Sequence, residues 1–283
     1  MSATGHAADA PTNVNSAPHG GIQVGIMPVA ALDELTRDGG SLLTAREQEA
    51  VSRLKHATRR SESVAGRLVA KWLFVRQVAD VADERREITW PPETHSVTPG
   101  ALDAVPQRDY GGIEILPGDG GAPRLTSCDG TRADTVRISI AHRDGWAAAA
   151  VSRSVPIGVD LEVVAPRGPS FYEGCVSDRE RQWLSGASPA HTECLATLLW
   201  AVKEACFKTG ASTATSVWGI GAIDLDIRTP AEQVASSLAA HTSTRMQVLD
   251  LDVTVRAAEL HPRVAYATRG ASTLAVMALI PRE

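Results

Sequence analysis

Five charged side chains on two short segments have the types and spacing needed to bind a divalent cation and a phosphate group. The first segment, residues 158–162 (Gly-Val-Asp-Leu-Glu), is predicted to be a strand, so that Asp160 and Glu162 project from the same face. The second segment, residues 200–208 (Trp-Ala-Val-Lys-Glu-Ala-Cys-Phe-Lys), is predicted to be a helix. Its charged members are Lys203, Glu204 and Lys208. Because Mg²⁺ typically takes one or two carboxylates together with waters and phosphate oxygens, the pattern predicts a magnesium ion bound to a phosphorylated substrate.

Each segment taken alone has a simpler interpretation. Alternating acids are common on a strand that faces water on one side. A Glu that precedes a Lys by four residues, as Glu204 precedes Lys208, forms a surface ion pair that stabilises a helix by about 0.2–0.5 kcal/mol. The two segments together favour a functional site.

Together these segments resemble the motifs of the 4′-phosphopantetheinyl transferases, in particular the larger, pseudodimeric Sfp-type branch. That family carries a G-[IV]-D-x-E strand and a W-[ST]-x-K-E-[AS]-x-x-K helix, which residues 158–162 and 200–208 match. Residues 138–146 resemble a weaker family motif that ends in Ser-His beside an aromatic residue, and residues 121–124 resemble its G-x-P segment. The resemblance runs from about Leu43 to Leu279. Two positions depart from it: Ala141 replaces the usual serine before His142, and Ala201 replaces a Ser or Thr.

The resemblance implies a holo-carrier-protein synthase. Such an enzyme transfers 4′-phosphopantetheine from coenzyme A to a serine of an apo acyl or peptidyl carrier protein in fatty-acid, polyketide or nonribosomal-peptide synthesis, and releases adenosine 3′,5′-bisphosphate. Asp160 and Glu162 would hold Mg²⁺, and Glu204 would be either a third ligand or the general base that accepts the serine proton. Lys208 would contact the pyrophosphate, and Lys203 would assist. The expected catalytic residues are thus Asp160, Glu204 and Lys208.

The resemblance also implies further contacts to coenzyme A and to the carrier protein. His142 would bind a coenzyme A phosphate, although a hydrogen-bonded histidine in a turn is the simpler interpretation. The 3′-phosphate needs a basic pocket, and the basic residues ahead of the helix at residue 61 are the candidates; the alternative is a solvated basic face. These candidates are Arg53, Arg59 and Arg60. Lys71 matches a basic family position and could instead be structural. Residues 179–184 fall where the family presents its carrier-protein surface, with core packing of Trp183 and Leu184 as the alternative.

The surrounding pattern predicts the elements that must position these residues. A helix in residues 41–49, capped by Thr44 or Ser41, and a helix over residues 61–82 precede strands at 113–116, 136–140 and 146–152. A strand at 157–164, a helix at 192–208 and strands at 222–227, 248–256, 264–267 and 274–279 follow. We therefore expect an α+β fold with two similar lobes in one chain, each a helix packed on a small, mostly antiparallel sheet. The expected division is a disordered tail (1–21), an N-terminal lobe (22–155) and a C-terminal lobe (156–283).

Composition narrows the partners. The chain has 283 residues and a formal net charge of −5, so a nucleic-acid partner held by a broad basic field is not expected. Its apolar runs are too short to cross a bilayer, and residues 1–21 lack the apolar core of a signal peptide. Four cysteines without regular spacing indicate reduced thiols. We expect a cytoplasmic protein, and the resemblance to the pseudodimeric branch implies a monomer.

Three other functions remain open at this stage. The same acids would suit another Mg²⁺-dependent phosphoryl- or nucleotidyl-transferring enzyme. A catalytically silent protein could bind coenzyme A or a carrier protein without transfer, which the intact acids argue against. The short trimeric holo-carrier synthase type is disfavoured by the length of this chain.

Overall fold

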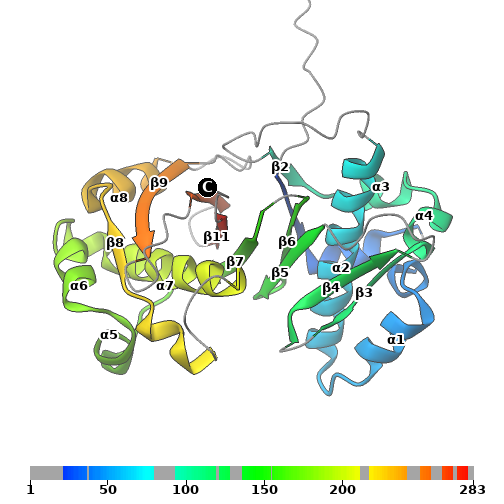
Figure 1. The fold of residues 1–283 in the computed structure, drawn as a ribbon, viewed down its shortest axis with the longest axis horizontal. Coiled ribbons are helices and arrows are strands. Elements are labelled where there is room, and N and C mark those ends of the chain that lie inside the picture. The colour runs from blue at the N-terminus through cyan, green and yellow to red at the C-terminus, as the bar shows by residue number, and fades with distance from the viewer. Residues whose placement is uncertain are drawn as a thin grey trace, which may run out of the picture.

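The structure is a computed structural model, and it describes ten stretches of the chain. These are residues 22–36, 38–79, 93–118, 121–127, 136–153, 155–210, 217–240, 249–255, 263–269 and 273–279. The tail predicted over residues 1–21 lies outside them. Two larger sheets and a two-stranded ribbon form the β structure of these stretches, and helices lie against both larger sheets (Figure 1). None of the helices in the described part of the chain has the length and apolar character needed to cross a membrane.

The first sheet has the strand order β2-β1-β6-β5. Its strands are β1 (Gln23–Pro28), β2 (Glu93–Ser96), β5 (Arg137–Arg143) and β6 (Trp146–Ser152). Helix α2 (Ala57–Ala79) packs along it. The other elements of this half are η1 (Val29–Glu34), η2 (Gly39–Leu42), α1 (Ala45–Ser52), α3 (Pro99–Asp103), α4 (Gln107–Gly111) and the antiparallel ribbon β3 (Ile113–Pro117) and β4 (Pro123–Ser127).

The second sheet is antiparallel throughout, with the order β7-β11-β10-β9-β8. Its strands are β7 (Ile157–Val163), β8 (Leu225–Ile227), β9 (Leu249–Val255), β10 (Arg263–Arg269) and β11 (Thr273–Leu279). Helix α7 (Thr192–Lys208) lies against β7 and β11. The remaining elements are α5 (Pro169–Cys175), α6 (Asp178–Leu184), η5 (Pro189–His191), η6 (Val217–Ala222) and α8 (Ala231–Ala239).

The two sheets meet where β5 and β6 pack against β7, at the centre of the view in Figure 1. Alternate residues of β7, among them Val159 and Leu161, enter an apolar cluster with Ala141 of β5 and Ala148 of β6. Because the side chains of a strand alternate between faces, the residues between them turn toward α7. The packing of the two sheets therefore fixes which face of β7 carries Asp160.

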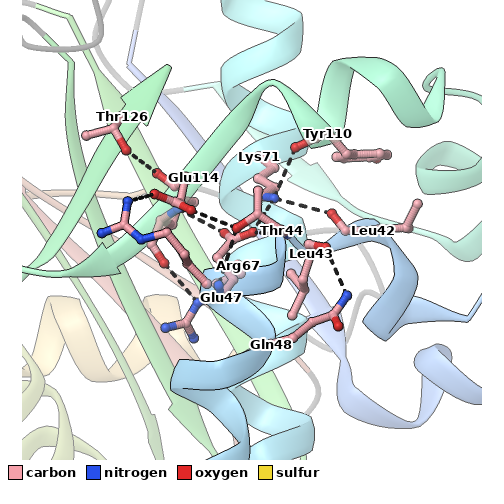
Figure 2. A network of polar contacts seen from close by, with 12 residues as sticks. Leu42, Leu43, Thr44, Glu47, Gln48, Arg67, Lys71, Tyr110, Glu114 and Thr126 are labelled. Atoms are coloured by element: carbon pink, nitrogen blue, oxygen red, sulfur yellow. Dashed lines mark hydrogen bonds and ion pairs between the residues drawn. The ribbon is translucent and has the colours of Figure 1, made fainter. Parts of the chain in front are cut away.

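A buried polar network ties α1 to α2 in the N-terminal half. The ammonium group of Lys71 is completely buried and donates to Glu47 Oε2 at 2.6 Å and to the carbonyls of Leu42 and Tyr110 (Figure 2). The other oxygen of Glu47 accepts from the backbone N–H of Ile115 on β3 at 2.9 Å. Burial lowers the pKa of Lys71, and the Glu47 carboxylate opposes that shift. Lys71 therefore has the structural role that the sequence left as an alternative.

Most predicted elements are present, with shifted ends. The helix 192–208 and the strand 146–152 have the predicted bounds, and Thr44 caps α1 in a capping box with Glu47. Helix α2 begins four residues earlier than predicted, at Ala57. The mixture of helices and small sheets agrees with the α+β class. The division into lobes at residues 155 and 156 stays a prediction.

Candidate functional site

The strand with the two acids lies unusually close to the helix with the third. A Cβ atom at Gly158 would lie 1.9 Å from the carbonyl oxygen of Ala205, so only glycine allows β7 to approach α7 this closely. Asp160 and Glu162 follow on the same face of the strand and are both buried, with 6 % and 7 % of their surface exposed. The close approach at Gly158 thus directs both carboxylates toward the C-terminal half of α7.

Asp160 forms an ion pair with Lys208 at the end of α7. Lys208 Nζ lies 2.6 Å from Asp160 Oδ1 and also donates to the backbone carbonyl of Val159 at 3.1 Å. The second oxygen of Asp160, Oδ2, is buried and has no hydrogen-bond partner among the described residues. A buried acceptor without a partner is costly, which makes this atom a natural ligand for a cation.

Glu162 lies between two arginines from different parts of the chain. Its Oε2 is 3.3 Å from Arg167, in the segment after β7, and 3.7 Å from Arg143, at the end of β5. Burial and the Asp160 carboxylate raise the pKa of Glu162, whereas the two arginines oppose the shift. The sequence predicted neither arginine, because both contacts depend on how β5 and the segment after β7 fold back onto the strand.

Glu204 belongs to the same electrostatic cluster. It is half-buried on α7, and burial raises its pKa, with further contributions from the carboxylates of Asp160 and Glu162. The positive charges of Lys208 and Arg143 oppose this rise. The structure therefore brings the three predicted acids and Lys208 into one cluster.

The donor set fits a hard cation, although the described residues contain no ready-made cage for one. No three His, Cys, Asp or Glu side chains in these stretches converge as metal ligands, and Lys208 occupies one oxygen of Asp160. The unpaired Oδ2 of Asp160 and the raised pKa values of Glu162 and Glu204 show that the basic neighbours neutralise this group of carboxylates only in part. Oxygen donors of this kind suit Mg²⁺. The magnesium site stays a prediction that the chemistry of these residues supports.

His142 lies beside this cluster and contacts residues of α2. Its Nδ1 is 3.2 Å from Glu62 Oε2 and 3.1 Å from a guanidinium nitrogen of Arg59. Burial lowers the pKa of His142; the Glu62 carboxylate opposes this, whereas Arg59 and Lys208 add to it. The structure thus brings two predicted phosphate-binding residues together, with a buried carboxylate that the sequence analysis missed. The i, i+3 spacing of Arg59 and Glu62 was its only sequence signal.

Arg53 and Arg60, the other two candidates for the 3′-phosphate pocket, have no hydrogen bond or ion pair to His142, Arg59 or Glu62 in the structure. Arg53, the residue after α1, is exposed and pairs with Glu49 of that helix at 2.6 Å. Arg60 donates to the backbone carbonyls of Leu54 and Lys55 after α1. Both contacts match the alternative of an ordinary basic surface more closely than a phosphate pocket.

The expected contact between Lys203 and coenzyme A is at odds with the position of this side chain. Lys203 is 1 % exposed and donates to Glu180 Oε2 at 2.9 Å and to the carbonyls of Cys175 and Gly221. Its ammonium group is therefore already satisfied within the core by partners on α5, α6 and η6, and none of these partners belongs to the cluster around Glu204. The reason lies in the helical period: Lys203 follows Leu199 by four residues and so lies on the buried face.

The segment 179–184, predicted as a carrier-protein surface, forms most of α6 and divides between surface and core. Leu184 is buried, and the indole of Trp183 donates to the carbonyl of Thr229 at 2.9 Å. Arg179 and Arg181 stay on the surface, where they pair with acidic neighbours. Trp183 and Leu184 therefore pack against the core, which was the alternative to a carrier-protein surface.

Comparison with known families agrees with the site. Residues 156–251 match the family model described as the 4′-phosphopantetheinyl transferase superfamily. The matched segment is about a third of the chain and contains β7 and α7 with all three acids. No curated protein matches the chain in sequence. The match supports the superfamily and, in general terms, a transferase of phosphopantetheine that uses coenzyme A and acts on carrier proteins.

Proposed function

We propose that the protein is an Sfp-type 4′-phosphopantetheinyl transferase. It transfers 4′-phosphopantetheine from coenzyme A to a serine of an apo acyl or peptidyl carrier protein, in a Mg²⁺-dependent reaction that releases adenosine 3′,5′-bisphosphate. The observation that carries the proposal is the cluster of Asp160, Glu162 and Glu204 with Lys208, in the part of the chain that the family model matches.

In this reaction the serine oxygen attacks the phosphorus that bears pantetheine, and the bond from that phosphorus to the bridging oxygen breaks. Asp160 and Glu162 would hold Mg²⁺, which neutralises charge on the pyrophosphate when bound. Glu204 serves as a third ligand or accepts the serine proton; burial, which raises its pKa, makes it a better proton acceptor than an exposed glutamate. Lys208 moves from Asp160 to the leaving phosphate as a point charge.

The arrangement of the two halves supports the pseudodimeric branch. His142 and Arg143 come from β5 in the N-terminal half, whereas the acids come from β7 and α7 in the C-terminal half. One chain thus supplies both sides of the site, so the proposed enzyme acts as a monomer. The short trimeric type is therefore not required.

The proposal is tested by incubating the purified protein with Mg²⁺, coenzyme A and several apo carrier proteins. Intact-mass spectrometry should show the carrier serine modified with phosphopantetheine, and chelation of the metal should stop the reaction. Asp160→Ala and Glu162→Ala should each lower the rate at least about a thousandfold, because metal stabilisation of the transition state is worth several kcal/mol. Both variants should keep the circular dichroism spectrum of the parent protein.

Two outcomes would contradict the proposal. The first is an unmodified mass for every apo carrier tested with the parent protein. The second is a near-parental rate in either alanine variant, which would exclude the proposed metal ligands. Product analysis adds a separate check, since a different nucleotide product would indicate another phosphoryl- or nucleotidyl-transfer reaction.

A further inference from the structure

Glu62 is a buried carboxylate that the proposed mechanism does not use. It lies in the second turn of α2, and its side chain is 8 % exposed. Four residues later, a Cβ atom at Gly66 would lie 2.6 Å from Ile140 of β5, so the helix and the strand approach closely there. Because alternate strand residues share a face, His142 follows Ile140 on the side of β5 that faces α2. The close approach at Gly66 therefore places Glu62 opposite His142.

The contacts of His142 Nδ1 indicate that Glu62 controls whether this ring nitrogen carries a proton. The same nitrogen lies 3.2 Å from Glu62 Oε2 and 3.1 Å from the guanidinium of Arg59. A ring nitrogen can either donate a proton to the carboxylate or accept one from the guanidinium, but not both. Glu62 also lies 3.8 Å from Arg59, so it can pair with the arginine while it accepts from the histidine. An ionised Glu62 favours a proton on Nδ1, and the guanidinium of Arg59 must then turn from the ring nitrogen to the Glu62 carboxylate.

This arrangement determines what the ring offers to a ligand. A phosphate group accepts hydrogen bonds, so it binds a protonated Nε2. With one proton already on Nδ1, a proton on Nε2 makes the ring a cation, held between the Glu62 carboxylate on one side and the phosphate on the other. Without Glu62, burial and the charges of Arg59 and Lys208 all favour the neutral ring.

We infer that Glu62 is a positioning residue for a phosphate group of coenzyme A. It acts through His142, whose protonation and orientation it sets, and through Arg59, which it holds beside the ring. The inference rests on the proposed function, because it assigns a role in binding the substrate of that reaction. Glu62 itself does not touch the substrate.

The test compares Glu62→Gln with the parent enzyme in steady-state transfer assays. Glutamine keeps the shape and can still accept from Nδ1, but it lacks the charge that favours the cationic ring. We expect the KM for coenzyme A to rise about tenfold, the size of one charge-assisted hydrogen bond, with kcat changed less than about threefold. The matched control is Glu232→Gln, which removes a half-exposed carboxylate facing His191 at 3.9 Å, outside the proposed site. This control should leave both constants unchanged.

Two further measurements separate positioning from general destabilisation. In a His142→Ala background, Glu62→Gln should add less than about twofold to KM, since the two residues act as a unit. Nitrogen-15 NMR of the histidine rings should show Nδ1 of His142 protonated in the parent protein and a changed proton distribution in Glu62→Gln. Comparison of coenzyme A with 3′-dephospho-coenzyme A then identifies the phosphate involved, because the effect of the variant disappears when that phosphate is missing.

The outcomes for this inference differ from those for the proposed function. A parent protein that transfers phosphopantetheine, with a KM in Glu62→Gln within twofold of the parental value, overturns the role of Glu62 and leaves the proposed function intact. A parent protein that transfers nothing overturns both. An NMR spectrum in which Nδ1 of His142 is unprotonated in the parent protein overturns the inference without any assay of activity.

Discussion

The two halves of the molecule hold their long helices by the same buried arrangement. In the N-terminal half Glu47 of α1 pairs with Lys71 of α2, and in the C-terminal half Glu180 of α6 pairs with Lys203 of α7. In each half the glutamate closes a capping box and accepts a backbone N–H from a nearby strand, and the lysine also donates to two backbone carbonyls. We call these two arrangements the lysine–glutamate clamps.

The residues that follow the clamp lysine along each helix differ between the two halves. The residue after the clamp lysine is Trp72 in α2 but Glu204 in α7. The fifth residue after it is Arg76 in the first helix and Lys208 in the second. Both halves therefore have the clamp that holds the helix, but the clamp lysine is followed by an acid, Glu204, in the C-terminal half and by Trp72 in the N-terminal half.

The strands that pack against these helices, β1 and β7, also share a structural feature and differ in their charged residues. Gly25 of β1 lies against α2 as Gly158 of β7 lies against α7, because a Cβ atom at either glycine would meet the helix at less than 3 Å. Two residues later stands the fully buried Met27 in the first strand and Asp160 in the second. The apolar residues of the first half complete a core, whereas the acids of the second half repel one another and are paired with basic side chains. The difference suggests three experiments.

The largest effect is expected from breaking a clamp. Lys71→Met and Lys203→Met each leave a buried glutamate without its counter-ion, which costs about 3–5 kcal/mol of the free energy of unfolding. Urea denaturation followed by circular dichroism measures both losses. If the clamps are equivalent, the losses will agree within about 1 kcal/mol. A Lys203→Met protein as stable as its parent would show that this lysine is not held in the core.

A smaller effect is expected from the basic residues five positions after the clamp lysines. Lys208→Ala removes the charge that pairs with Asp160 and is proposed to bind the pyrophosphate, so transfer should slow about a hundredfold. Arg76→Ala is the matched control, since this exposed arginine lies over the ring of Trp72, 4.9 Å from its centre, in the half without the acids. Rates of carrier modification at saturating coenzyme A measure both. Equal losses in the two variants would remove the distinction between the halves.

The smallest effect concerns pH. Burial raises the pKa of Glu204, so the folded, metal-free protein binds this proton more tightly than the unfolded chain does. Ionised Glu204 therefore lowers the free energy of unfolding most at a pH above its raised pKa. This loss of stability declines as the pH falls from the raised pKa toward the ordinary pKa of glutamate. Glu204→Gln should raise the free energy of unfolding at pH 7 by less than about 1 kcal/mol, because the group is partly exposed.

This pH effect is measured by urea denaturation in chelator at several pH values, with Glu232→Gln as the control. The gain in Glu204→Gln should shrink as the pH is lowered. A constant gain at all pH values would show that the charge of Glu204 does not cause it. Addition of Mg²⁺ should stabilise the parent protein and not Asp160→Ala, since an ion that binds only the folded state raises its stability.

Local patterns in the sequence were sufficient to predict several elements and the acid cluster. The strand 146–152 is mostly alanine and valine, and the helix 192–208 has a continuous apolar stripe, so their bounds follow from composition and period. The α6 helix was missed although Ser177 and Glu180 have the capping-box spacing, because its residues are mostly polar. The first strand, β1, was not predicted because a glycine within its six residues weakens the strand pattern.

The parts of the site that the sequence could not supply are contacts between distant elements. Glu62, Arg143 and Arg167 reach His142 or Glu162 only because α2, β5 and the segment after β7 converge. No spacing within one element encodes such contacts. Lys203 is a case in which a local pattern did carry the answer. Its position next to Glu204 in the charged motif predicted a contact with coenzyme A, whereas the helical period predicts the buried position that the structure shows.

The hydrogen bonds of Val159 also bear on solubility. β7 is the outermost strand of its sheet, and such a strand offers unpaired backbone groups to which another chain could add. At Val159 both groups are occupied by side chains, the N–H by the hydroxyl of Ser139 at 3.0 Å and the carbonyl by Lys208 at 3.1 Å. The Ser139 hydroxyl and the Lys208 ammonium group thus cover the edge of β7 at this residue, where β5 also packs against the strand, so both halves of the chain help to prevent another chain from adding here.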